Sequence, residues 1–201
     1  MNRRDFVLGL GALAATGSAF ANNEGRGPFD TVGPHKADAR TVYEFLSFSC
    51  PYCQQYHEAI AAWGRSIPVP VKFEPVPVVV DLETFKAARA FYSVLKAAPS
   101  QIDIYTRVAL EGYRRGYTDI AAPEILHQGG VNRKAFDQAW KSPMVKTSIE
   151  TAMALTEKYA IAVTPSIAIG GTTVLHADHV NGDYGMLMKL ASGFVSRLLE
   201  R

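Results

Sequence analysis

The sequence has 201 residues, of which 48% are hydrophobic and 20% are charged, and its formal net charge at pH 7 is +2. This length and composition exclude global disorder and fit one domain, with or without an insertion. The near-neutral charge, with no run of five basic residues, gives no support to nucleic-acid binding. Only two cysteines are present, which excludes a disulfide-rich scaffold.

The first 21 residues have the features of a cleavable export signal. Arg3 and Arg4 precede an apolar stretch rich in glycine and alanine, and a small-x-small cleavage motif ends at Ala21. The stretch is shorter than the roughly twenty apolar residues of a membrane-spanning helix, although an N-terminal anchoring helix is an alternative. The paired arginines also resemble a twin-arginine signal, while the ordinary secretory route stays open. We expect residues 1–21 to be removed on export to the periplasm.

The first half of the mature chain alternates strand and helix. Residues 22–40, rich in Gly, Pro, Asn and Asp, suggest an extended lead-in. Residues 41–48 are β-branched and aromatic, which predicts a strand that runs directly into the cysteines. A helix follows to about residue 63. Residues 69–80 predict a second strand, in which three prolines favour an edge position.

The middle of the chain has helical periodicity. From residue 82 to about residue 159, apolar side chains recur at intervals of three and four. Pro99, Gly129-Gly130 and Ser142-Pro143 divide this stretch into several helices. Asn132 is expected to cap one of these helices.

Strand character returns near the C-terminus. Residues 165–169 and 172–175 predict two strands joined by Gly170-Gly171 as a two-residue hairpin turn. Residues 184–199 predict a closing amphipathic helix. The whole order is therefore strand, helix, strand, helical block, hairpin and helix.

The sequence Cys50-Pro51-Tyr52-Cys53 lies where the first strand ends and the first helix begins. Two intervening residues allow a disulfide across the first helical turn. The unpaired N–H groups and positive dipole of a helix N-terminus stabilise a thiolate, and Pro51 fits the first turn. We expect Cys50 to be the exposed, acidic nucleophile and Cys53 to be the buried resolving thiol.

Two other interpretations of the cysteine pair compete with this one. A zinc site needs two further ligands, and the nearest group in sequence is His176 and His179 beside Asp178. A purely structural disulfide is the second alternative, but closing so short a loop removes little chain entropy.

Thr164-Pro165 lies at the start of the first returning strand. A cis bond before Pro165 would expose the backbone of Thr164 beside the cysteines, where a substrate peptide could pair with it. From the spacing alone an ordinary trans bond is favoured, because cis bonds are a small minority before proline.

Together these features resemble the DsbA family of thiol–disulfide oxidoreductases. The resemblance extends from about Thr41 to the C-terminus. It is most specific over residues 44–53 and at Thr164-Pro165. It implies an α/β, thioredoxin-like fold formed by residues 22–81 and 154–201, with an inserted all-helical domain at residues 82–153. It also implies that Pro165 is cis and faces the cysteine pair.

The resemblance further implies a buried acid at Glu44, six residues before Cys50. Its strand neighbours are apolar on both sides, which favours burial over a solvent-facing position. A buried carboxyl group could exchange a proton with Cys53 and tune the reaction without being required for it. His57 lies one helical turn beyond Cys53, and we expect it to pack at the surface.

Two residues depart from the pattern of the family's oxidases. Tyr52 occupies a position that often holds His, so we expect a less acidic Cys50 and a less oxidising couple. Thr164 stands where Val is common, and CPYC with Thr-Pro resembles the isomerase and reductase branches of the superfamily. Those branches carry a separate dimerisation domain, for which the mature chain has no room.

The resulting hypothesis is a monomeric periplasmic oxidase that introduces disulfides into exported proteins. The resemblance implies reoxidation by a DsbB-type, quinone-linked membrane partner and requires neither an organic cofactor nor a metal. A reductase or isomerase using the same site is one alternative. A peptide-binding module or chaperone with a static disulfide is the other.

Overall fold

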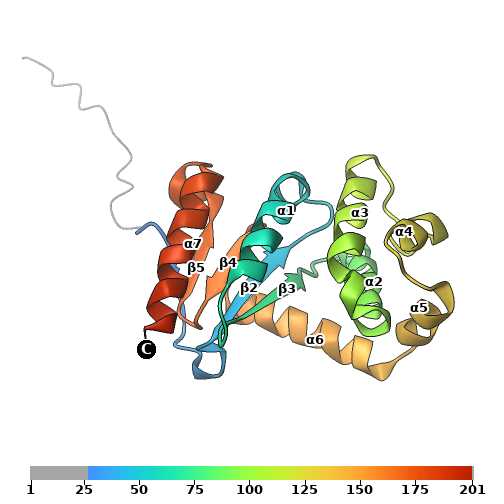
Figure 1. The fold of residues 1–201 in the computed structure, drawn as a ribbon, viewed down its shortest axis with the longest axis horizontal. Coiled ribbons are helices and arrows are strands. Elements are labelled where there is room, and N and C mark those ends of the chain that lie inside the picture. The colour runs from blue at the N-terminus through green and yellow to red at the C-terminus, as the bar shows by residue number, and fades with distance from the viewer. Residues whose placement is uncertain (1–26, 201) are drawn as a thin grey trace, which may run out of the picture.

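The computed structural model describes residues 27–200, so the predicted export signal lies outside the described residues. Its centre is a five-stranded sheet with the order β1-β5-β4-β2-β3 (Figure 1). β2 and β3 are parallel, and the other neighbouring strands are antiparallel. The strands are β1 (Asp30–Thr31), β2 (Thr41–Leu46), β3 (Lys72–Pro77), β4 (Ser166–Ile169) and β5 (Thr173–His176).

The described part of the chain also contains seven α-helices. They are α1 (Pro51–Ser66), α2 (Leu82–Ala97), α3 (Ile102–Arg114), α4 (Pro123–Gln128), α5 (Arg133–Trp140), α6 (Pro143–Lys158) and α7 (Tyr184–Leu199). Three short 3-10 helices are η1 (Lys36–Asp38), η2 (Pro99–Gln101) and η3 (Ala177–Val180). Across residues 27–200, none of the helices combines the length and apolar character that spanning a bilayer requires.

The predicted order of elements is confirmed, while one local prediction is incomplete and another is wrong. The lead-in at residues 22–40 contains β1, which pairs with β5 and is too short to leave a pattern in the sequence. The hairpin turn has three residues, because Ile169 and Thr173 are the last paired residues of β4 and β5. β3 is an edge strand as its prolines predicted.

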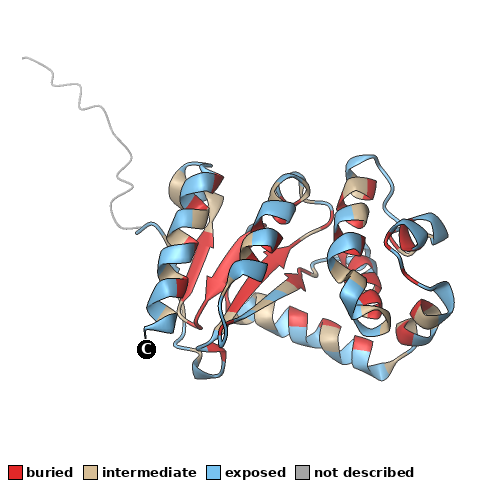
Figure 2. Cartoon of the chain, in the orientation of Figure 1, coloured by how far each residue is buried: buried red, intermediate tan, exposed pale blue. Residues whose placement is uncertain are grey.

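The two faces of the sheet bury different helices. Alternation along β2 directs Val42 and Glu44 toward α1 and α7, and directs Tyr43 and Phe45 toward α6. The first face packs β2, β4 and β5 against apolar residues of α1 and α7. The second packs the same strands against α6 and Tyr159 at its end. Consequently β2, β4 and β5 are almost entirely buried, whereas β1 is exposed and β3 is only partly buried (Figure 2).

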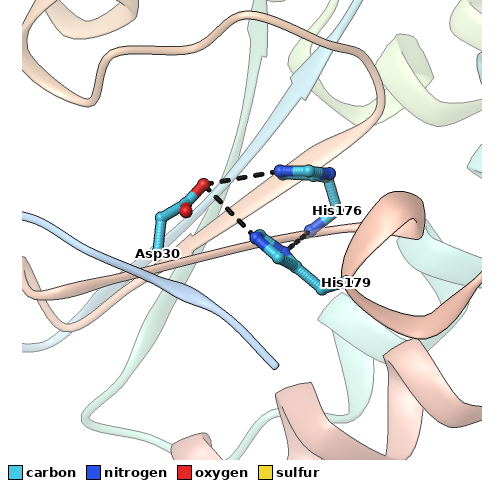
Figure 3. A group of neighbouring side chains, drawn as sticks. All are labelled: Asp30, His176 and His179. Atoms are coloured by element: carbon cyan, nitrogen blue, oxygen red, sulfur yellow. Dashed lines mark hydrogen bonds and ion pairs between the residues drawn. The ribbon is translucent and has the colours of Figure 1, made fainter. Parts of the chain in front are cut away.

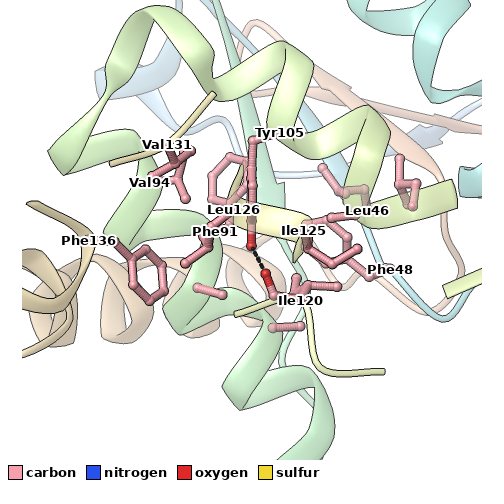
Figure 4. Close-up of a cluster of buried hydrophobic side chains, with 14 of the residues drawn as sticks. Leu46, Phe48, Phe91, Val94, Tyr105, Ile120, Ile125, Leu126, Val131 and Phe136 are labelled. Atoms are coloured by element: carbon pink, nitrogen blue, oxygen red, sulfur yellow. Dashed lines mark hydrogen bonds between the residues drawn. The ribbon is translucent and has the colours of Figure 1, made fainter. Parts of the chain in front are cut away.

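The remaining helices enclose a second apolar core, to which α2, α3, α4 and α5 contribute (Figure 4). At its centre the hydroxyl of Tyr105 donates to the carbonyl of Ile120 at 3.0 Å. Leu46, Phe48 and Cys53 belong to the same cluster. The helical region therefore packs against the end of β2 from which the cysteines follow.

The two ends of this helical region differ. At its start α2 begins at Leu82 with a capping box formed by Asp81 and Thr84. At its other end the expected boundary after residue 153 falls inside α6, a continuous helix that also covers the sheet. The division of the chain at residues 82 and 153 stays a prediction.

Candidate active site

Cys50 occupies the N-cap of α1, and Pro51 is the first residue of that helix. Both cysteines are free thiols, Cys50 half-buried and Cys53 fully buried. The Cys50 thiol donates to the carbonyl oxygen of Thr164 at 3.1 Å, and the N–H of Ser47 donates to Cys53 Sγ at 3.4 Å. The reactive sulfur is thus at the surface and its partner lies one helical turn inside.

The surroundings separate the acidities of the two thiols. The thiol of Cys53 donates to Cys50 and lowers the pKa of Cys50 to about 5, against the opposing effect of partial burial. The Thr164 hydroxyl and the N–H groups of Cys53 and Tyr52 add to this lowering. The same hydrogen bond, together with burial, raises the pKa of Cys53 far above its ordinary value. One thiolate, on Cys50, is therefore the favoured charge state of the reduced pair.

The loop before β4 completes the site. The Thr164–Pro165 peptide bond is cis, as the family resemblance implied, and places the Thr164 carbonyl at the Cys50 sulfur. Ser166 begins β4 and pairs with Phe45 near the end of β2. Through this pairing, residues separated by more than 110 positions in sequence meet at one end of the sheet.

Glu44 is fully buried on the α1 face of β2, and one of its oxygens lies 2.9 Å from Nδ1 of His57. Its other oxygen, Oε2, is buried without a hydrogen-bond partner in the described structure. Burial disfavours the charged imidazole, but the Glu44 carboxylate outweighs this effect and raises the pKa of His57. The pair lies on the face of α1 that also carries Cys53, four residues earlier.

The expectation that His57 packs at the surface is wrong. His57 is only 5% exposed, because it faces the sheet and not the solvent. The i, i+4 spacing from Cys53 pointed to this position, but the sequence did not show which side of α1 faces β2.

A stack of three tyrosines, from α1 and α7, lies beside the motif. The rings of Tyr56 and Tyr184 are stacked with centroids 3.5 Å apart, and Tyr52 stacks on the same Tyr184 at 6.3 Å. Tyr184 is the first residue of α7 and was not singled out from the sequence. Tyr52 itself is 57% exposed, so the residue between the cysteines presents an aromatic ring at the surface.

The histidines of the alternative zinc interpretation do not lie with the cysteines. Among the described residues, the one group with metal-binding spacing combines His176 and His179 with Asp30, and it includes neither thiol. The structure thus brings together Cys50, Cys53 and the Thr164–Pro165 loop, while Glu44 contacts His57 on the Cys53 face of α1.

Comparison with known proteins gives a consistent result. A family model described as Thioredoxin matches residues 30–183. A protein of Bordetella parapertussis named thiol:disulfide interchange protein DsbA is 24% identical over 94% of this chain and 94% of its own length. A DsbA of Burkholderia cepacia is 26% identical over 82% of this chain and 80% of its own length.

Solved structures share the fold. The crystal structure of Pseudomonas aeruginosa DsbA superposes with a TM-score of 0.74 at 20% identity, covering 85% of this chain and 92% of that one. A Proteus mirabilis DsbA variant, solved with a non-covalently bound peptide, has a TM-score of 0.70 at 20% identity, covering 87% and 97%.

Proposed function

The chain belongs to the thioredoxin superfamily and, within it, to the DsbA family of thiol:disulfide oxidoreductases, and on this premise we propose that it is a dithiol oxidase of the periplasm. The observation that carries the direction is the contrast between the two thiols. A Cys50 pKa lowered to about 5 stabilises the reduced form of the pair as a thiolate at neutral pH. A couple whose reduced form is stabilised is a better oxidant.

The proposed reaction begins with the Cys50–Cys53 disulfide. A substrate thiolate attacks Cys50 Sγ, forming a mixed disulfide and releasing Cys53, which takes up a proton. The second substrate thiolate then attacks the substrate's own sulfur in the mixed disulfide and releases Cys50 as a thiolate. The substrate loses two electrons and two protons; the enzyme pair gains both electrons, Cys53 holds one proton and the other is released to solvent.

Other residues of the site have supporting roles in this proposal. The backbone of Thr164, a half-buried residue before Pro165, pairs with the substrate segment that carries the attacking thiol. Glu44 exchanges the proton that Cys53 gains and loses: its Oε2 is buried and unpaired, and its partner His57 lies on the Cys53 face of α1. Pro51 and Tyr52 shape the surface on which the substrate sulfur approaches.

The proposed substrates are exported proteins that contain cysteines. The peptide bound non-covalently by the Proteus mirabilis relative supports a peptide segment as the ligand. A DsbB-type membrane partner is proposed to reoxidise the pair, and the chain is proposed to act as a monomer after removal of residues 1–21. The cysteine pair supplies the redox chemistry without a further cofactor, as in the DsbA family.

A reductase or isomerase role is the second candidate, and the pair Tyr52 and Thr164 favours it. Alkylation of thiols in the intact cell separates the two directions. An enzyme trapped mostly as the disulfide supports the oxidase. An enzyme trapped mostly as the dithiol overturns that direction in favour of the reductase.

The activity itself is tested by oxidative refolding of reduced ribonuclease. We expect the oxidised enzyme to accelerate recovery of ribonuclease activity, and Cys50→Ala to reduce the rate to that without enzyme. Ser49→Ala, at the exposed preceding residue, is the matched control and should retain the wild-type rate. Equal rates for the wild type and Cys50→Ala would rule out the proposed role of Cys50.

A further inference from the structure

One group of metal-ligating side chains has no part in the thiol chemistry. Asp30 of β1, His176 at the end of β5 and His179 of η3 each offer one ligand atom, and these atoms all lie within 4.8 Å of one another. Figure 3 shows both imidazole rings directed at the Asp30 carboxylate. We propose that these three residues form a binding site for a divalent transition-metal ion such as Zn²⁺.

Two of the three distances between the ligand atoms, those from Asp30 to each histidine, fit a tetrahedral ion. Oδ2 of Asp30 lies 3.4 Å from Nε2 of His176 and 3.3 Å from Nε2 of His179. Both separations are longer than a good N–H···O hydrogen bond of about 2.7–3.2 Å. Zinc bonds of about 2.0–2.1 Å give a tetrahedron with edges of about 3.3–3.4 Å. Both measured separations agree with such edges.

The ligand set selects the class of metal. Two imidazoles and one carboxylate suit Zn²⁺ and other first-row transition ions, whereas Ca²⁺ and Mg²⁺ prefer oxygen ligands. Three protein ligands leave a position open for water or another small ligand. The two histidine side chains are 16% and 5% exposed, while Asp30 is 48% exposed, so the ion would enter from the Asp30 side.

An unsatisfied atom gives a second reason for the assignment. Nδ1 of His176 is buried without a hydrogen-bond partner, and Oδ2 of Asp178 is 3.6 Å away. With a metal on Nε2, the ring proton lies on Nδ1 and can be donated to the exposed Asp178 carboxylate. Such a carboxylate behind a metal-bound histidine is a common means of orienting the ring.

Metal binding would break one existing hydrogen bond, which lies between His176 and His179. The backbone N–H of His176 donates to Nδ1 of His179 at 3.1 Å, which places the proton of a neutral His179 ring on Nε2. A metal on Nε2 takes the place of that proton, and the proton moves to Nδ1. The amide of His176 then loses its acceptor, so its resonance reports on the exchange.

The proposed metal site is separate from the cysteine pair but lies at the same end of the sheet. His176 pairs with Ser166 across β4 and β5, and Ser166 directly follows Pro165. Any test must therefore prevent the thiols from binding the added metal. The tag-free protein in its disulfide form meets this need and leaves the three proposed ligands unchanged.

The first experiment titrates the oxidised protein with Co²⁺ and records the visible absorption of the ion. We expect one equivalent to bind with the intense bands of a tetrahedral site. His176→Gln and His179→Gln should each weaken binding by more than about 100-fold, since changes behind the ligands already cost about 10–100-fold. Asp178→Asn should fall in that smaller range, and His127→Gln, an exposed histidine of α4, should bind as the wild type does.

The second experiment uses only the wild-type protein, so its result does not depend on whether a variant folds. Zn²⁺ is added to the ¹⁵N-labelled oxidised protein, and the His176 amide should shift more than amides remote from the site. Stoichiometric tetrahedral Co²⁺ bands with this shift support the proposal. Absence of stoichiometric binding, or bands that persist unchanged in His176→Gln and His179→Gln, would overturn it.

Discussion

One carboxylate is buried on each face of the sheet, Asp38 on the α6 side and Glu44 on the α1 side, and their surroundings differ. On the α6 side, Asp38 accepts hydrogen bonds from the hydroxyls of Tyr43 at 3.2 Å and Tyr159 at 2.7 Å, and it pairs with Lys158. On the α1 side, Glu44 has His57 on one oxygen and no partner on the other. The first carboxylate is fully satisfied, whereas the second is only half satisfied.

The difference separates a structural role from a chemical one. A satisfied buried network holds its elements in one arrangement, here η1, β2 and the end of α6. A buried oxygen without a partner is costly, so a native structure that keeps one calls for an explanation. At Glu44 the explanation we propose is proton exchange with Cys53. Substitution of Asp38 should therefore lower the stability more than the reaction rate, and substitution of Glu44 should lower the reaction rate more than the stability.

The largest expected effect is the loss of stability on removing Asp38. Asp38→Ala leaves the hydroxyls of Tyr43 and Tyr159 without an acceptor, and it leaves the charge of Lys158 unpaired. We expect the free energy of unfolding in urea to fall by about 3 kcal/mol. The refolding activity of the folded variant should stay within about twofold of wild type, since a structural group leaves the reaction barrier unchanged.

A matched control is Asp137→Ala. Asp137 pairs with Arg133 at 2.9 Å on the surface of α5, with both side chains about half exposed. Its removal should cost about 0.5 kcal/mol or less. If Asp38→Ala is no more destabilising than Asp137→Ala, the network around Asp38 does not have the stabilising role argued from its geometry.

The next effect is kinetic and concerns Glu44. In Glu44→Gln, the carboxylate that would accept the Cys53 proton is replaced by an amide of similar shape. Oxidation of the reduced enzyme by glutathione disulfide should then show a normal first phase, in which Cys50 attacks. The second phase, in which Cys53 resolves the mixed disulfide, should be slower by about tenfold. This loss is smaller than the usual contribution of a general base, because water can accept the Cys53 proton in place of Glu44.

Glu74→Gln is the control for this measurement, since Glu74 is exposed on the edge strand β3. Both phases should match the wild type in that variant. Equal slowing of both phases in Glu44→Gln would indicate a general disturbance of the site. An unchanged second phase would exclude Glu44 from the proton exchange.

The sequence predicted the elements well because periodic apolar residues and the strand–helix junction are local signals. The core of the site was predictable for the same reason, since the position of Cys50 at a helix start follows from neighbouring residues. The cis bond at Pro165 came from the family resemblance, because the spacing alone favoured a trans bond.

What the sequence did not predict depends on contacts between distant segments. The burial of His57 depends on which side of α1 faces β2. Tyr184 joins the site because α7 packs against α1, and Asp30 reaches His176 because β1 adds to the edge of the sheet. None of these contacts has a periodic or short-range pattern that a single sequence could display.

The smallest expected effect is a pH dependence of stability that originates at His57. Because its pKa is raised in the folded protein, protonated His57 stabilises the fold below its ordinary pKa of 6.5, and this contribution is lost as the pH rises through the folded value. At pH 6, the unfolding free energy of the wild type in its disulfide form should therefore exceed that of His57→Gln by about 1 kcal/mol. At higher pH the two values should converge, since glutamine can still donate a hydrogen bond to Glu44. His127→Gln, at an exposed site, should give a constant difference over the same range. If the wild type instead gains stability relative to His57→Gln as the pH rises, His57 is not paired as a cation with Glu44, and the half-satisfied carboxylate would need another partner.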